Sequence, residues 1–106
     1  MLKELYGTSM LKYENKEETL EYYILNNSDE VNENKIGIYG IEIVKRNNTS
    51  EEKSFVSDLT VNKAFAEEIM KKMKDNVVTP VHLYDVLENF LWNLYRIFKI
   101  TNIKTW

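Results

Sequence analysis

The spacing of hydrophobic residues changes once along the chain. In the first 60 residues the apolar side chains alternate with a period of two, whereas between residues 61 and 100 they recur every three or four positions. This order predicts an α+β fold with a sheet-forming half (1–60), a helical pair (61–100) and a short tail (101–106). At 106 residues, a single domain spanning 1–106 is expected.

The clearest predicted strand is residues 35–46 (KIGIYGIEIVKR), which carries apolar side chains on both faces as a central strand does. Segments 20–27 and 53–59 predict its two neighbours, and a weaker strand around 9–13 would lie at the edge. We therefore expect a three- to four-stranded antiparallel meander, followed by two helices packed on one face, in the order β-β-β(-β)-α-α.

The second face of this sheet has no evident cover. Strand 20–27 places apolar side chains on both sides, with Tyr22 on one and Tyr23 on the other. Either residues 1–11 cover the second face, or a patch of Tyr and Ile stays exposed as an interface. Homodimerisation through this face or through the long helix is therefore one expectation.

Two amphipathic helices are predicted. Residues 61–75 place four apolar side chains on one side, namely Phe65, Ile69, Met70 and Met73. Residues 79–100 predict a longer helix, with Thr79 as N-cap and Pro80 at the first helical position. Its broad apolar arc, which includes Leu87 and Leu91, is expected to face the core, and the opposite stripe is polar except for Trp92.

This polar stripe is the main candidate for a functional surface. Glu88 and Arg96 flank Trp92 at four residues on either side, and Asp85 and Lys99 lie one turn beyond. A tryptophan near an arginine, rimmed by mixed charge, has the composition of a protein-binding hot spot. The predicted partner-binding residues are thus Asp85, Glu88, Trp92, Arg96 and Lys99. The structural alternatives are that Trp92 lies under another segment of the chain, or that Arg96 stacks over it as a cation–π pair.

The composition excludes several kinds of site. The chain has no cysteine, which removes disulfides, thiolate metal sites and cysteine nucleophiles. The net charge is −3 and neither half has a basic excess, so direct nucleic-acid binding is not expected. The long helix is too polar for a membrane span and the N-terminus has no signal-peptide pattern. We expect a cytoplasmic protein that neither contacts a membrane nor needs a cofactor or metal.

Three motifs that suggest chemistry or nucleic-acid binding also have structural explanations. His82, the only histidine, could share a polar site with Asp85 and Asp58, but it equally suits the capped start of a helix. Gly37 and Gly40 form a bare GxxG, yet they lie within a strand, where glycine marks a bulge or close packing. A helix-turn-helix would turn the acidic residues of its second helix toward phosphates. No catalytic residues are predicted, and we expect a protein that is not an enzyme.

Three segments resemble a known family. They are YGIEIVKR (39–46), SDLTVNKAFAEEIMKKM (57–73) and TPVHLYDVLENFL (79–91), and the region that they span, 39–91, is about half of the chain. They are similar to a family of small uncharacterised clostridial (Firmicutes) proteins with a YGI strand, a D-I-S-like helix start and a P-x-H-L-x-D-V helix. Leu59 replaces a β-branched residue of that pattern, and Asn89 replaces an acid. The resemblance implies a cytoplasmic bacterial single-domain protein, draws attention to His82 and Asp85, and implies no activity.

These patterns predict a small non-catalytic interaction or regulatory protein that binds another protein or itself. Binding would use the stripe around Trp92 and an aromatic sheet face. One alternative is a phage- or mobile-element-encoded inhibitor, of the anti-CRISPR kind, that blocks a host enzyme or nucleoprotein; the acidic N-terminal half is compatible with it. Another alternative is a small-molecule enzyme that uses His82, Asp85 and Asp58.

Overall fold

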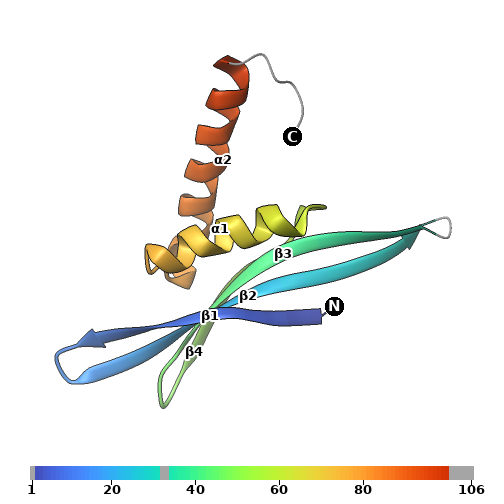
Figure 1. Ribbon diagram of the computed structural model, residues 1–106. Coiled ribbons are helices and arrows are strands. Elements are labelled where there is room, and N and C mark those ends of the chain that lie inside the picture. Colours follow the sequence, from blue (N-terminus) through green and yellow to red (C-terminus); the bar gives the residue numbers. More distant parts are fainter. Residues whose placement is uncertain (1, 32–33, 101–106) are drawn as a thin grey trace.

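The chain forms a four-stranded antiparallel sheet followed by two helices, which confirms the predicted α+β class (Figure 1). The computed structural model describes the backbone of residues 2–31 and 34–100 and the side chains of residues 2–27 and 37–94. The elements are β1 (Leu2–Tyr13), β2 (Lys16–Val31), β3 (Asn34–Arg46), β4 (Glu51–Thr60), α1 (Lys63–Asp75), the 3-10 turn η1 (Pro80–His82) and α2 (Leu83–Ile100).

The sheet is a meander in the order β1-β2-β3-β4, with strands longer than the sequence pattern predicts. The largest difference is at the N-terminus, where β1 pairs with β2 from Leu2 opposite Asn26 to Tyr13 opposite Lys16. The alternative in which the N-terminal residues cover the second face is therefore wrong. As an edge strand, β1 can pair about half of its backbone N–H and C=O groups with its neighbour β2. The alternation of apolar and polar side chains is weak along β1, so the sequence pattern predicted only a short strand there.

Gly40 explains how β3 and β4 come together. A Cβ atom at Gly40 would lie 2.1 Å from the carbonyl oxygen of Val56, so only glycine permits this backbone approach. The register between the two strands shifts at the same place, between Tyr39 and Ile41. At Gly37, an added Cβ would lie 2.8 Å from the Tyr39 hydroxyl oxygen. The GxxG motif therefore marks a bulge and close packing, as expected from its place within a strand.

The core lies between α1 and one face of the sheet. The sheet contributes Leu20, Tyr22, Ile24, Ile41 and Ile43, α1 contributes Ala66, Ile69, Met70 and Met73, and the following segments contribute Val78, Leu83 and Leu87. Phe65, predicted on the buried side of α1, is only half-buried, and Ala66 takes the fully buried position. The side-chain oxygen of Asn62 caps α1 by accepting a hydrogen bond from the backbone N–H of Phe65 at 3.3 Å.

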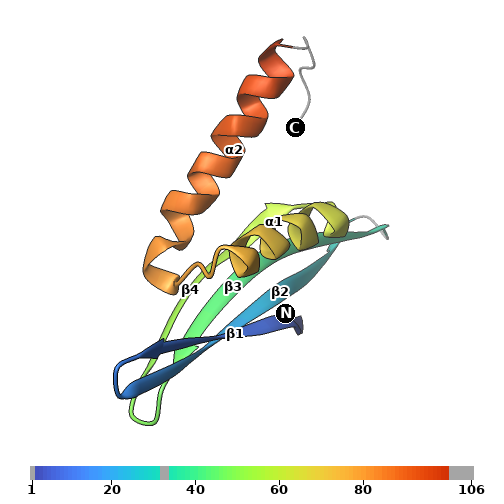
Figure 2. The ribbon, with the colours of Figure 1, turned by 60° about the vertical axis from the view of Figure 1, so that its left-hand side comes forward.

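The second helix starts at the core and then leaves it. Thr79 makes no side-chain cap hydrogen bond, and Pro80 opens the η1 turn rather than the α-helix itself. Leu83 and Leu87 are buried, so the first two turns of α2 belong to the core. Figures 1 and 2 show α1 lying across the sheet while α2 rises away from it, so the C-terminal half of α2 stands clear of the body. Packing on the sheet face is thus complete for α1 and limited to the start of α2.

Candidate functional site

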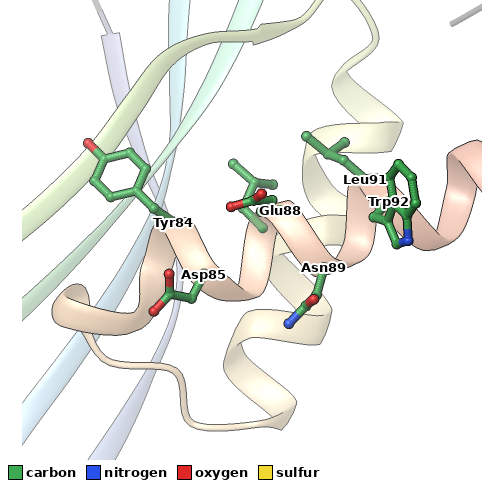
Figure 3. Close-up of a pocket in the computed structure, with 7 residues that line it drawn as sticks. Tyr84, Asp85, Glu88, Asn89, Leu91 and Trp92 are labelled. Atoms are coloured by element: carbon green, nitrogen blue, oxygen red, sulfur yellow. The ribbon is translucent and has the colours of Figure 1, made fainter.

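A surface pocket runs along one flank of α2 (Figure 3). It is lined by Tyr84, Asp85, Leu87, Glu88, Asn89, Leu91 and Trp92, and we call it the α2 pocket. Three of the predicted partner-binding residues (Asp85, Glu88 and Trp92) therefore lie together. The side chains of the other two, Arg96 and Lys99, lie outside the described residues, although their backbone belongs to α2.

The helical period assembles this pocket from two adjacent rows. Tyr84, Glu88 and Trp92 follow one another at four-residue spacing, and Leu87 and Leu91 form the neighbouring row. Leu87 is buried and Leu91 is half-buried, so these side chains supply an apolar floor. The sequence pattern had assigned both leucines to the core and had not singled out Tyr84. The sequence does contain a signal for Tyr84 as a pocket residue: it lies four residues before Glu88 and eight before Trp92, and so falls in the same row of the helix.

Tyr84 ties the pocket to the edge of the sheet. Its hydroxyl donates a hydrogen bond to the backbone carbonyl of Phe55 in β4 at 2.8 Å. This bond joins residues 29 positions apart and holds the first turn of α2 beside the edge strand. Figure 3 shows Tyr84 and Leu91 on one side of the helix, with Asp85 and Asn89 on the other. The α2 pocket thus has an apolar side near β4 and a polar side away from it.

Trp92 is a surface residue, since 57% of its area is exposed. The alternative that another segment buries it is therefore wrong for the described part of the chain. Stacking by Arg96 would involve a side chain outside that part. Asp85 and Glu88 are also exposed, and no described side chain forms an ion pair with either carboxylate. An exposed indole thus lies next to carboxylate charges that the described residues leave unneutralised.

The sheet face opposite α1 is the second candidate surface. One row of facing residues crosses all four strands on this side, formed by Leu5, Tyr23, Glu42 and Phe55. Leu5 and Phe55 are about half exposed at the two edges, whereas Glu42 is buried in the centre. The other apolar residues of this side are covered, since Leu25 and Val44 are buried. Tyr23 and Ile38 are half-buried, so the described part of this face carries no exposed patch of Tyr and Ile. The open face instead combines one tyrosine, charged groups and apolar edges.

The charges on this open face are paired. The Lys3 ammonium lies 2.6 Å from the Glu42 carboxylate and 4.2 Å from the centre of the Tyr23 ring. The hydrogen bond with Glu42 is the main cause that raises the pKa of Lys3. Arg46 donates to Glu21 at 2.8 Å, and this bond is the main cause that lowers the pKa of Glu21. These pairs neutralise the face, so it presents less net charge to a partner than the α2 pocket does.

The residues of the hypothetical histidine site do not share one cavity. His82 lines a separate hollow beside Val86 and Phe90, whereas Asp85 lines the α2 pocket. Asp58 is exposed on β4 and lines neither of these two hollows. Among the described side chains (residues 2–27 and 37–94), no three His, Cys, Asp or Glu are placed to hold a metal ion. The geometry therefore gives more support to the α2 pocket than to a site at His82.

Residues 1–93 match the family described as Family of unknown function (DUF6514), so the chain belongs to that family. The match runs from β1 to Trp92 and one residue beyond, and thus includes the whole α2 pocket. It confirms the expected membership in a family of unknown function. No curated protein and no solved structure matches the chain. Neither described helix has the length and apolarity needed to cross a membrane.

Proposed function

We propose that this chain is a small, non-catalytic interaction or regulatory protein that binds a protein partner, or itself, through the α2 pocket. In this proposal it acts in a bacterial cytoplasm without a cofactor. The observation that carries it is the half-exposed indole of Trp92 beside the apolar floor of Leu87 and Leu91. Interface hot spots are enriched in tryptophan and lie in well-packed pockets that exclude water.

The exposed indole is large enough to support binding. A tryptophan side chain can bury roughly 200 Å², so covering the exposed half removes about 100 Å² from water. At about 25 cal/mol per Å², this burial stabilises a complex by about 2–3 kcal/mol. Rim charges such as Asp85 and Glu88 would add mainly to specificity and association rate. A partner with basic groups around an apolar centre fits this surface best.

The open sheet face can extend the same interface. Phe55 belongs to both surfaces, because its carbonyl accepts the Tyr84 hydrogen bond while its half-exposed side chain lies on the open face. A partner seated in the α2 pocket could therefore also contact β4, which is an edge strand with unpaired backbone groups. The paired charges around Glu42 make the centre of that face a weaker candidate.

The inhibitor alternative receives less support. The feature that favoured an inhibitor was the acidic N-terminal half of the chain, but many of the carboxylates in that half form ion pairs. Described examples are Glu42 with Lys3, Glu18 and Glu52 with Lys45, and Glu21 and Glu51 with Arg46. An acidic surface that blocks a nucleic-acid-binding protein needs carboxylates left free for the target.

Partner capture with matched baits tests the proposal. Wild type, Trp92→Ala and Met10→Ala would each be immobilised and exposed to a lysate of the source organism. Met10 is the control because it is a large side chain with nearly the same exposure as Trp92 (56% against 57%) but lies on β1. We expect a stoichiometric protein, or added copies of the chain, on wild type and Met10→Ala but not on Trp92→Ala. Equal capture by all three baits would place the interface elsewhere.

A further inference from the structure

We infer that the partner of the α2 pocket is a second copy of this chain, with the two α2 helices packed antiparallel about a twofold axis near Trp92. This inference rests on the proposed function, because it names the partner of the same surface.

The position of α2 leaves room for such a pair. The helix has 18 residues, which corresponds to a length of about 27 Å. Its inner side is buried at Leu83 and Leu87, and the next inward residues, Phe90 and Leu91, pack only partly against the core. Trp92 is 57% exposed and so lies on the outer side. Both ribbon views show α2 rising away from the sheet toward its C-terminal end (Figures 1 and 2). A second helix can therefore lie along the outer side without displacing the core.

The charge pattern of α2 selects the antiparallel direction. Asp85 and Glu88 precede Trp92 by seven and four residues, and Lys99 and Arg96 follow it by the same two intervals. In an antiparallel pair centred on Trp92, each acid of one helix faces a base of the other, and twofold symmetry repeats both pairs. A parallel pair would bring like charges together, which is unfavourable. Arg96 and Lys99 enter this argument only through their positions in the helix.

The described acids fit this arrangement. Asp85 and Glu88 are exposed and form no ion pair with a described side chain, although many acids of the sheet do. At the axis, Trp92 would meet its own copy, with Leu91 beside it as an apolar wall. A contact that uses one helix from each protomer is small, so we expect a dissociation constant on the order of micromolar.

Charge reversal tests the pairing directly. One variant carries Asp85→Lys and Glu88→Lys, and the other carries Arg96→Glu and Lys99→Glu. We expect wild type to dimerise in sedimentation equilibrium, and each variant alone to dissociate at least tenfold more readily, because its four facing charges now have one sign. An equimolar mixture should form a heterodimer. Glu67→Lys with Glu68→Lys is the matched control, since it makes the same charge change on the exposed side of α1 and should leave the dimer intact.

Cysteine cross-linking tests the direction of the pair, since the natural chain contains no cysteine. Positions 88 and 96 are about 12 Å apart along one helix, too far for a disulfide within the chain. Glu88→Cys with Arg96→Cys should therefore give covalent dimers on mild oxidation, and Glu88→Cys alone should not. Efficient dimers from the single variant would indicate a parallel pair and overturn the inference.

The outcomes separate this inference from the proposed function. A wild-type chain that stays monomeric up to about a hundred micromolar, roughly a hundredfold above the expected dissociation constant, would overturn self-pairing. Charge-reversed variants that still dimerise would overturn it as well. If a monomeric chain nevertheless captures another protein in a Trp92-dependent way, the proposed function stands and the partner is not a second copy. If neither self-association nor capture depends on Trp92, both are refuted.

Discussion

Replacing Tyr22 with Phe would test how the sheet positions the start of α2. The Tyr22 side chain is fully buried, and its hydroxyl donates a hydrogen bond to the carbonyl of Val78 at 3.0 Å. Val78 lies between α1 and η1, so this one bond joins β2 to the connection that leads into α2. Tyr22→Phe removes the hydroxyl and leaves the ring in place.

The expected cost at neutral pH is about 1–3 kcal/mol of unfolding free energy, because the buried carbonyl of Val78 loses its partner. For a domain of this size, each kcal/mol corresponds to a shift of about 4–8 °C in melting temperature. The removal of one oxygen creates little cavity, so most of the loss comes from the hydrogen bond. A mutation that only loosened packing would not show the pH dependence described next.

The same residue makes a prediction at alkaline pH. Burial is the main cause that raises the pKa of Tyr22 to about 12, from an ordinary value of 10.0. Above pH 10 the unfolded tyrosine loses its proton while the folded one keeps it, so the wild type loses stability as the pH rises toward 12. The full difference corresponds to roughly 3 kcal/mol. Tyr22→Phe lacks this loss, and the stability gap between the two proteins should narrow as the pH rises.

Urea unfolding of both proteins between pH 7 and pH 11 measures this gap. Comparing the two proteins cancels the contributions of the other tyrosines. A gap below about 0.3 kcal/mol at pH 7 would mean that the hydrogen bond does not stabilise the fold, since a buried bond of this kind contributes about 1 kcal/mol. A gap that stays constant through pH 11 would refute the assigned burial of the hydroxyl.

Four further substitutions follow from the packing. Gly40→Ala should cost at least about 3 kcal/mol, because its Cβ would lie 2.1 Å from a β4 carbonyl oxygen, and an unchanged melting temperature would contradict that approach. Leu87→Ala should cost about 2–4 kcal/mol, whereas Trp92→Ala should cost less than about 1; a loss of about 3 kcal/mol for Trp92 in urea unfolding would place it in the core. Arg46→Gln should lower the stability only slightly at pH 7, because an ion pair near the surface contributes little to the free energy of unfolding. This loss of stability should diminish as the pH falls below 4.5, the ordinary pKa of the Glu21 carboxyl, because Arg46 lowers that pKa and its contribution is lost as the pH falls through the folded pKa. Equal losses at pH 7 and at acidic pH would disprove the pairing.

The type and order of the elements could be predicted from the sequence because side-chain period is a local property. Alternation in 35–46 predicted the central strand, and the helical arc of α2 placed Leu87 inward and Trp92 outward, as the structure confirms. Asp85, Glu88 and Trp92 could be grouped for the same reason, since residues three and four apart share one side of a helix.

Contacts between distant segments were decided only in the tertiary structure. The pairing of β1 with β2 and the hydrogen bond from Tyr84 to Phe55 each join residues that no local period relates. The direction in which α2 leaves the sheet was likewise decided by tertiary packing and not by a local pattern. The spacing of apolar residues shows which side chains share one face of a helix or strand. What that face contacts depends on how the whole chain packs, and this packing places the α2 pocket beside the edge strand β4.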